Sequence, residues 1–170
     1  MLTHKLTQAD NLSDFSCGVT ELDTYLKKYA LLGNRIDDAM TYVATTATGE
    51  VMGFYTLVVG SVVYAGAPQR VRKGLPRHPV PVMILARLAV DSRHQGRELG
   101  RKLVLDALLR TMQAADIAGI RAVLVHAKNE DLVAWYKQLG FEEGPEPRTL
   151  FLLMKDVRRA AKEAGVLHLQ

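Results

Sequence analysis

Two periods of hydrophobic residues run along this chain, one of two residues and one of about 3.6 residues. Residues 41–46 and 51–64 are rich in β-branched and aromatic side chains and flank Thr48-Gly49, which predicts a β-hairpin. After residue 98, apolar side chains recur at helical spacing. Applied to the whole chain, the two periods predict strands at 2–6, 41–46, 51–64, 82–90, 122–126 and 150–154, and helices at 21–30, 99–118, 129–139 and 155–167.

The order of these elements favours one mixed domain. The strands first form a meander and then alternate with helices, and a loop rich in proline and arginine is predicted at 68–81. The first helix is expected to end near Gly33-Asn34. With 170 residues and 48% hydrophobic content, the chain is long enough for one full core, and no Pro/Gly/Ser-rich linker divides it. We therefore expect a single α/β (α+β) domain over residues 1–170.

Composition excludes several classes of protein. No apolar stretch approaches the length of a bilayer span, and residues 1–5 lack the start of a secretory signal, so we expect a cytoplasmic protein with no membrane partner. Cys17 is the only cysteine, which excludes an internal disulfide, and no histidine is spaced to activate it as a nucleophile. The five histidines are scattered, so we expect no metal site.

A candidate anion site lies between the strand at 82–90 and the helix that follows it. At a helix N-terminus the first N–H groups have no intrahelical partners, and the helix dipole adds positive character. A pyrophosphate can bind there without a dedicated side chain, and Arg93, Arg97 and Arg101 add positive charge. A plain strand-to-helix crossover is the structural alternative. The loop has the sequence Gln95-Gly96-Arg97-Glu98-Leu99-Gly100.

A second segment favours the functional interpretation. After the strand at 122–126 the chain carries Asn129 and Tyr136, and Gly140-Phe141 follows. Together the two segments resemble the GNAT family of N-acetyltransferases, in which a Gln/Arg-x-x-Gly-x-Gly/Ala loop holds the pyrophosphate of acyl-CoA. The resemblance implies a GNAT fold, which is a mixed, mostly antiparallel sheet with two splayed central parallel strands and flanking helices. It also implies acetyl-CoA as the acetyl donor, without a metal.

The resemblance assigns roles to individual residues. Tyr136 would protonate the departing CoA thiolate, and the alternative is a core tyrosine beside Leu132 and Leu139. Asn129 would hydrogen-bond pantetheine, cap its helix, or do both. Backbone N–H groups at 88–90 would bind the thioester carbonyl and pantetheine. The residues expected to contact the cofactor are Leu88, Ala89, Val90, Gln95, Gly96, Arg97, Glu98, Leu99, Gly100, Arg101 and Asn129.

Glu98 departs from the family pattern, which has a glycine at this position. A glycine lets the backbone approach the phosphates closely, whereas a carboxylate adds a like charge beside them. We therefore expect weaker acetyl-CoA binding, although a glutamate near a helix N-terminus favours the helix itself.

Further segments narrow the resemblance. Residues 15–18, 22–26, 51–57, 77–82, 85–91 and 148–152 are not general acetyltransferase features. With them, the chain from about 12 to 156 resembles the acetyltransferase toxins of bacterial toxin–antitoxin pairs, the TacT and AtaT type. That resemblance implies acetylation of the α-amino group of aminoacyl-tRNA, which blocks translation. It also implies a homodimer and a ribbon-helix-helix antitoxin, through which operator DNA is bound.

The residues are compatible with that acceptor. A free α-amine has a pKa of about 7.7–8.0, so part of it is already neutral near neutral pH and a strong general base is dispensable. A lysine amine, with a pKa of about 10.4, would need such a base, and no Asp or Glu is plainly placed as one. A tyrosine, with a pKa of about 10 against roughly 8.5 for a thiol, is protonated and can donate to the leaving thiolate.

Charge provides a candidate for the RNA contact. The formal net charge is +4, and residues 70–102 hold nine Lys and Arg against only Asp91 and Glu98. This imbalance predicts a polyanionic partner, and the alternative is a solvated loop kept soluble by charge. The residues proposed to contact tRNA are Arg70, Arg72, Lys73, Arg77, Arg87 and Arg93.

Two other functions remain open from the sequence. One is an N-acetyltransferase acting on a small-molecule or protein amine, although cationic acceptors usually need an acidic pocket. The other is a binding module that pairs with an antitoxin and has lost efficient catalysis through Glu98. Measuring acetyl-CoA affinity and turnover distinguishes an enzyme from such a module.

Overall fold

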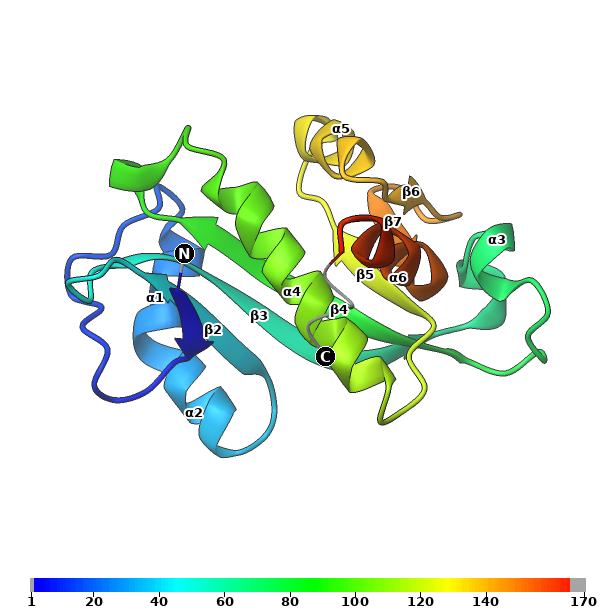
Figure 1. Cartoon of the computed structure of the whole chain (residues 1–170), viewed down its shortest axis with the longest axis horizontal. Helices are drawn as coiled ribbons and strands as arrows, with labels where there is room; N and C mark the ends of the chain where they lie inside the picture. The colour runs from blue at the N-terminus through cyan, green and yellow to red at the C-terminus, as the bar shows by residue number, and fades with distance from the viewer. Residues whose placement is uncertain (1, 166–170) are drawn as a thin grey trace. The chain divides into compact units, whose positions relative to one another are not determined.

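The computed structural model describes residues 2–165, and within them the chain folds into two compact units (Figure 1). The first unit comprises the chain up to Val58 together with Leu85–Ala107. The second unit comprises Val59–Ile84 and the chain from Leu108 onward. No helix in the described part of the chain is long and apolar enough to cross a membrane.

The seven strands of the described residues form one mixed sheet in the order β1-β2-β3-β4-β5-β7-β6 (Figure 1). Strands β4 and β5 run parallel, and their ladder joins residues 82–84 to residues 122–124. Antiparallel pairing joins β1 to β2, β2 to β3, β5 to β7 and β7 to β6. The expected mixed, mostly antiparallel sheet is confirmed. The strands are β1 Leu2–Lys5, β2 Met40–Thr45, β3 Val51–Val62, β4 Val80–Val90, β5 Ala122–His126, β6 Glu142–Glu143 and β7 Thr149–Leu153.

The helices complete the alternation that the sequence predicted. The predicted strands agree with the structure to within two residues at each end, and Gly49 adopts φ +88° in the hairpin turn. The helical elements are α1 Thr20–Thr24, the π-helical turn η1 Tyr25–Tyr29, α2 Ala30–Arg35, the 3-10 turns η2 Tyr64–Gly66 and η3 Ser92–His94, α3 Gln69–Arg72, α4 Leu99–Ala115, α5 Glu130–Gln138 and α6 Met154–Glu163.

The prediction of an uninterrupted loop at 68–81 is wrong. This segment contains the one-turn helix α3, and β4 already begins at Val80. A single turn cannot stabilise itself, since helix nucleation is unfavourable. Val71 supplies the missing stability because it is fully buried in a cluster with Val82 and Phe151. The short strand β6 was also missed, since two residues carry no periodicity.

Three predicted helix ends differ from the structure, and one of them is that of α4, which was predicted to reach residue 118 and ends at Ala115. The first helical segment continues through a π turn to Arg35 instead of ending near Gly33. Gly33 lies inside α2, where a Cβ would sit 3.3 Å from the carbonyl oxygen of Ala39, so close packing explains this glycine. The C-terminal helix, predicted to reach residue 167, ends at Glu163, and residues 166 and 167 lie outside the described residues.

Candidate functional site

The loop between β4 and α4, residues 91–100, is here called the cofactor loop, and Asp91 fixes its start. The buried Asp91 carboxylate accepts hydrogen bonds from the backbone N–H of Ser16 (3.0 Å) and of Arg93 (2.9 Å). The Arg93 guanidinium donates to the same carboxylate, with Nε 2.9 Å from Oδ1, and lowers the pKa of Asp91 to about 2. The loop therefore begins on a buried and ionised anchor.

The Gln95 side chain also holds the loop in place. Its amide donates to the carbonyl oxygens of Cys17 (3.0 Å) and Val90 (2.9 Å). Both donors of the amide are therefore used within the protein, and a contact of Gln95 with a ligand is left to its backbone. Cys17 itself is buried, and burial raises the pKa of its thiol, which disfavours the thiolate form.

Gly96 and Glu98 turn the chain toward α4. Gly96 has φ +78° and Glu98 has φ +59°, so both occupy the left-handed region. Glycine adopts this conformation freely, whereas a residue with a Cβ is strained there. The structure thus gives a reason for the glycine that the family pattern has at position 98. The Glu98 side chain is exposed. The backbone carbonyl oxygen of Glu98 accepts a hydrogen bond from the backbone N–H of Lys102 (3.1 Å).

The N-terminus of α4 forms the end of the cofactor loop. Leu99, Gly100 and Arg101 belong to its first turn, where N–H groups have no intrahelical acceptor. Arg97 and Arg101 are exposed and pair with no carboxylate in the part of the chain that the structure describes. These arginines are available for an anion, whereas Arg93 is bound by Asp91 and by Glu50 (3.0 Å).

Strand β4 leads into the loop through Leu88, Ala89 and Val90. Ala89 is buried, and Gly53 of β3 lies so close that a Cβ there would stand 2.9 Å from the Ala89 carbonyl oxygen. Arg87, proposed above to contact tRNA, lies with its guanidinium carbon 3.6 Å from the centre of the Tyr25 ring. Its charge is therefore already engaged in a cation–π contact.

In the second unit, Asn129 and Tyr136 lie at the start and on the body of α5. The Asn129 side-chain oxygen accepts from the N–H of Leu132 (2.9 Å), so the N-cap role that the sequence allowed is confirmed. The cap uses only the oxygen of this exposed side chain, so it does not occupy the amide N–H groups. A contact of Asn129 with pantetheine stays a prediction.

Tyr136 combines a buried ring with a protonated hydroxyl. The ring is 7% exposed and makes edge contacts with Trp135 and Phe141, at centroid distances of 4.9 and 5.4 Å. Burial raises the pKa of Tyr136 to about 12. Every fully buried side-chain oxygen or nitrogen among the described residues has a hydrogen-bond partner. The Tyr136 hydroxyl has no partner among these residues, so it cannot be fully buried. The small exposed part of this side chain therefore includes its hydroxyl, which is free to donate to a ligand.

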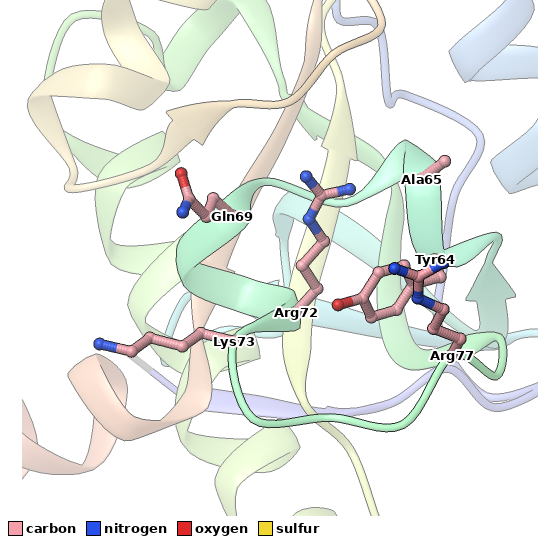
Figure 2. A pocket seen from close by; sticks show the side chains of 6 residues that line it. All are labelled: Tyr64, Ala65, Gln69, Arg72, Lys73 and Arg77. Carbon is pink, nitrogen blue, oxygen red and sulfur yellow. The ribbon is translucent and has the colours of Figure 1, made fainter.

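Residues 64–77 are here called the basic segment. The cationic side chains of this segment differ in their partners. Arg70 is paired with Asp156 through two hydrogen bonds, of 2.9 and 3.2 Å, and lies 3.8 Å from Glu142. Arg72, Lys73 and Arg77 line one open pocket and have no carboxylate partner in the described chain (Figure 2). Arg70 and Arg93 are thus weaker candidates for RNA contact than the sequence alone indicated.

Sequence reasoning missed three residues that shape these regions. Asp91 anchors the cofactor loop, Tyr64 lies under Arg72 in the basic segment, and Arg121 binds two carbonyl oxygens of that segment. Only Asp91 left a signal, because it is a carboxylate two residues before an arginine at a strand end. No cluster of three or more His, Cys, Asp or Glu side chains that could hold a metal exists within residues 2–165.

A protein-family comparison decides the class of this chain. The family model described as an acetyltransferase (GNAT) domain matches residues 37–143, which is more than half of the sequence. The chain belongs to the GNAT acetyltransferases. As a GNAT enzyme it uses acetyl-CoA as its acetyl donor.

Two relatives are similar over most of their length. A tRNA-acetylating toxin of Mycobacterium tuberculosis is 47% identical over 155 residues, which cover 91% of this chain and 92% of that protein. A probable toxin TacT of Sinorhizobium fredii is 32% identical over 154 residues, 85% of each chain.

Solved structures of the toxin AtaT resemble this fold closely. AtaT complexed with acetyl-methionyl-tRNA has a TM-score of 0.86 and 29% identity, over 94% of this chain and 98% of that one. An AtaT variant bound to the C-terminus of the antitoxin AtaR and to acetyl-CoA has a TM-score of 0.77 and 26% identity, over 94% and 96%. The AtaT–AtaR complex bound to DNA has a TM-score of 0.76 and 26% identity, over 94% and 99%.

Proposed function

We propose that this GNAT enzyme is a toxin that moves the acetyl group of acetyl-CoA to the α-amino group of aminoacyl-tRNA and so blocks translation. The observation that carries the proposal is the 47% identity to a tRNA-acetylating toxin over about nine tenths of both chains. The fold agrees with that of AtaT, which has been solved with an acetylated methionyl-tRNA. We retain the expectation that residues 1–170 act as one GNAT domain.

Acetyl-CoA would be held mainly by backbone groups of the cofactor loop. The first-turn N–H groups of α4 point out of the N-terminal end of the helix, and the helix dipole favours a pyrophosphate there. Exposed Arg97 and Arg101 add positive charge. Asp91 and Gln95 keep the loop in shape through hydrogen bonds within the protein. The backbone of Leu88, Ala89 and Val90 is proposed to bind pantetheine and the thioester carbonyl.

Acetyl transfer then needs only a neutral amine and a proton for sulfur. The neutral α-amine attacks the thioester carbon, the new C–N bond forms, and the C–S bond breaks as the nitrogen loses a proton. Burial raises the pKa of Tyr136 to about 12, so its hydroxyl is protonated near neutral pH. In this proposal its hydroxyl donates to the departing sulfur and recovers a proton from the nitrogen, so the tyrosine is unchanged after each turnover.

Partners follow from the same proposal. The acceptor is found in the cytoplasm, and we expect the protein to work there. The structures of AtaT with AtaR and DNA support a cognate antitoxin that covers this enzyme and links it to operator DNA. We propose that the antitoxin is a ribbon-helix-helix protein and that the toxin is a homodimer. Light scattering of the purified toxin and of its complex measures both assemblies.

The Tyr136→Phe variant tests the mechanism. The phenylalanine ring fills the same space beside Trp135 and Phe141, so the fold and acetyl-CoA binding should persist. Loss of one proton donor typically lowers the rate by about 10²- to 10⁴-fold. Single-turnover acetylation of charged tRNA measures the rate, and calorimetric titration with acetyl-CoA measures binding. More than about one third of the wild-type rate in the variant contradicts the acid role.

An acceptor comparison tests the substrate class. Wild-type protein is given charged tRNA, a small amine such as a polyamine, and a peptide with a free N-terminus, each with acetyl-CoA. We expect transfer to the aminoacyl α-amine to exceed the others by at least about tenfold in kcat/KM. Preference for the small amine or peptide points to the general acetyltransferase, and no transfer with intact acetyl-CoA binding points to a binding module.

A further inference from the structure

The basic segment encloses an open pocket of about 450 Å³ within the second unit. This volume lies in the range of small-ligand sites, roughly 300–1,000 Å³, so it exceeds what one isolated phosphate requires. Figure 2 shows Arg72 rising from α3 between Gln69 and Tyr64, with Lys73 and Arg77 extending on opposite sides. The lining residues are Tyr64, Ala65, Gln69, Arg72, Lys73 and Arg77.

The three cations of this pocket are available for an anionic ligand. Arg72, Lys73 and Arg77 have no carboxylate partner within residues 2–165, whereas the neighbouring Arg70 is neutralised by Asp156. The Arg72 guanidinium carbon lies 5.3 Å from the centre of the Tyr64 ring, which is a looser cation–π contact than that of Arg87 on Tyr25 at 3.6 Å and leaves its charge without a carboxylate. A pocket with unpaired positive charge and no acidic lining residue attracts anions and repels cations.

The pocket has a fixed frame, although α3 spans only one turn. Arg121 donates from Nε to the Val71 carbonyl oxygen (2.8 Å) and from Nη2 to the Lys73 carbonyl oxygen (3.0 Å). Val71 is fully buried, and Arg70 ties the same turn to Asp156 of α6. The backbone of residues 70–73, which carries two of the three cations, is therefore held by contacts with Arg121, next to β5, and with Asp156 of α6, both outside the basic segment. A solvated loop kept charged for solubility would need none of these contacts.

The arrangement matches the repeating unit of a nucleic acid chain. A nucleotide within RNA presents a flat base between two phosphates, and flat rings stack on tyrosine and arginine. In the view of Figure 2, the Tyr64 ring and the Arg72 guanidinium, which are in cation–π contact, have Lys73 to one side and Arg77 to the other. The exposed Gln69 amide can both donate and accept, as recognition of a base edge or a ribose 2′-hydroxyl requires. An acidic peptide would use the cations but would leave the ring pair without a partner.

We propose that this pocket is a single-nucleotide subsite for RNA. Lys73 and Arg77 bind the phosphates on either side of one nucleotide, and the nucleotide ring stacks on the Tyr64–Arg72 pair. The proposal rests on the proposed function, since the RNA is the aminoacyl-tRNA acceptor. It narrows the contact surface from the whole arginine-rich stretch to one pocket, and it makes Arg70 and Arg121 positioning residues that hold α3.

Salt-dependent binding of uncharged tRNA tests the proposal directly. The triple variant Arg72→Ala, Lys73→Ala and Arg77→Ala is compared with a control that removes the same charge elsewhere, Lys5→Ala, Lys28→Ala and Lys162→Ala, all exposed. Each phosphate contact contributes about −0.7 to −0.9 to the slope of log affinity against log salt. We expect the pocket variant to flatten the slope by about 1.4 or more and to weaken affinity at least about tenfold near 0.1 M salt. Equal slopes in the two triple variants overturn the proposal.

Ring substitution tests the stacking part separately. Tyr64→Leu removes the aromatic face, and Tyr64→Phe keeps it without the hydroxyl. Loss of one stacked base should weaken tRNA binding by about 5- to 150-fold in the leucine variant and by less than about threefold in the phenylalanine variant. Equal binding by both variants overturns the stacking. Circular dichroism confirms that both are folded.

Two further experiments distinguish RNA from other anionic ligands of the pocket. One is competition for tRNA binding, and the other is acetylation of an acceptor without phosphates. A single-stranded RNA oligonucleotide should displace tRNA from the pocket, whereas displacement by an acidic peptide or by CoA, but not by RNA, overturns the assignment. An aminoacyl-adenosine carries the reactive amine without a phosphate. We expect the pocket triple variant to acetylate it as wild type does, with a loss only on charged tRNA. If wild type acetylates neither acceptor, the proposed function fails, and tRNA binding still decides the subsite.

Discussion

The cofactor loop and the basic segment are both rich in arginine, and each divides its arginines between ones that build the structure and ones without a carboxylate partner. In the cofactor loop, Arg93 is held between Asp91 and Glu50 and stiffens the turn that presents backbone N–H groups. In the basic segment, Arg70 and Arg121 build the frame. The frame then presents other cations, Arg72 and its neighbours, without partners. Positive charge therefore marks a binding surface only where no carboxylate or carbonyl group already uses it.

The two regions also differ in how they would select a ligand. The cofactor loop offers N–H groups fixed by the helix, which suits a compact pyrophosphate. The basic segment offers long cationic side chains around a ring pair, which suits an extended chain with regularly spaced phosphates. In the proposed function, the first region would therefore bind the small cofactor and the second region the large RNA acceptor.

Removing the anchor of the cofactor loop should have the largest effect on stability. Asp91→Asn leaves Arg93 without its buried partner and weakens the hydrogen bonds to Ser16 and Arg93. Breaking a buried pair typically costs about 3–5 kcal/mol, and we expect about 3 kcal/mol because the guanidinium is partly solvated. Urea denaturation measures the change. The control Glu50→Gln removes the exposed partner of Arg93 and should cost less than about 1 kcal/mol.

The same anchor gives a pH dependence with a defined sign. Because the folded pKa of Asp91 is lowered to about 2, its contribution is complete above the unfolded value near 3.8 and is lost as the pH falls toward 2. The shift corresponds to about 2 kcal/mol. Unfolding free energies of wild type and Asp91→Asn should therefore converge by about this amount as the pH falls from 5 to 2. A constant difference between the two proteins over this range contradicts the assigned pKa.

Replacing Glu98, the strained residue of the cofactor loop, should raise both the affinity for acetyl-CoA and the stability of the fold. Glu98→Gly relieves the left-handed backbone and removes a carboxylate near the pyrophosphate site. We expect acetyl-CoA to bind up to about tenfold more tightly. We also expect a stability gain of about 0.5–1 kcal/mol. Glu98 precedes Leu99, the first residue of α4, so this variant puts no glycine inside the helix and loses only the interaction of the carboxylate with the helix dipole.

A matched variant separates the two causes. Glu98→Gln removes the charge but keeps the Cβ, so it should reproduce the gain in affinity without the gain in stability. Calorimetric titration with acetyl-CoA and thermal unfolding measure the two quantities. Equal or weaker acetyl-CoA binding by both variants means that the carboxylate points into solvent and does not impair the site.

The smallest effect is expected for the arginine that builds the basic segment. Arg70 is more than half exposed, and its pair with Asp156 lowers the pKa of that carboxyl group. Exposed pairs of this kind contribute less than about 1 kcal/mol. Arg70→Ala should therefore lower stability slightly and leave the salt dependence of tRNA binding nearly unchanged, in contrast to the pocket triple variant. A flattened slope in Arg70→Ala would place this residue among the RNA contacts after all.

The sequence alone predicted the longer strands and helices and the places of the proposed site residues along them, because these depend on local patterns. The loop before α4, the Asn129 cap and the position of Tyr136 on α5 all follow from spacing within one or two turns. The glycine expected at position 98 is explained by a backbone angle that its neighbours impose. Local geometry is encoded in neighbouring residues, so it can be read without the fold.

Tertiary structure decided which charges are free. Arg70 and Asp156 are 86 residues apart in the chain, Gln95 and Cys17 are 78 apart, and Arg121 and Val71 are 50 apart. Ion pairing and hydrogen bonding fall off steeply with distance in space, and separation along the chain does not report that distance. The same holds for α3, whose single turn exists only because Val71 is buried against strands from elsewhere in the chain. Composition could predict a polyanionic partner. Only the fold distinguishes the arginines that hold the structure together from those that remain available to bind such a partner.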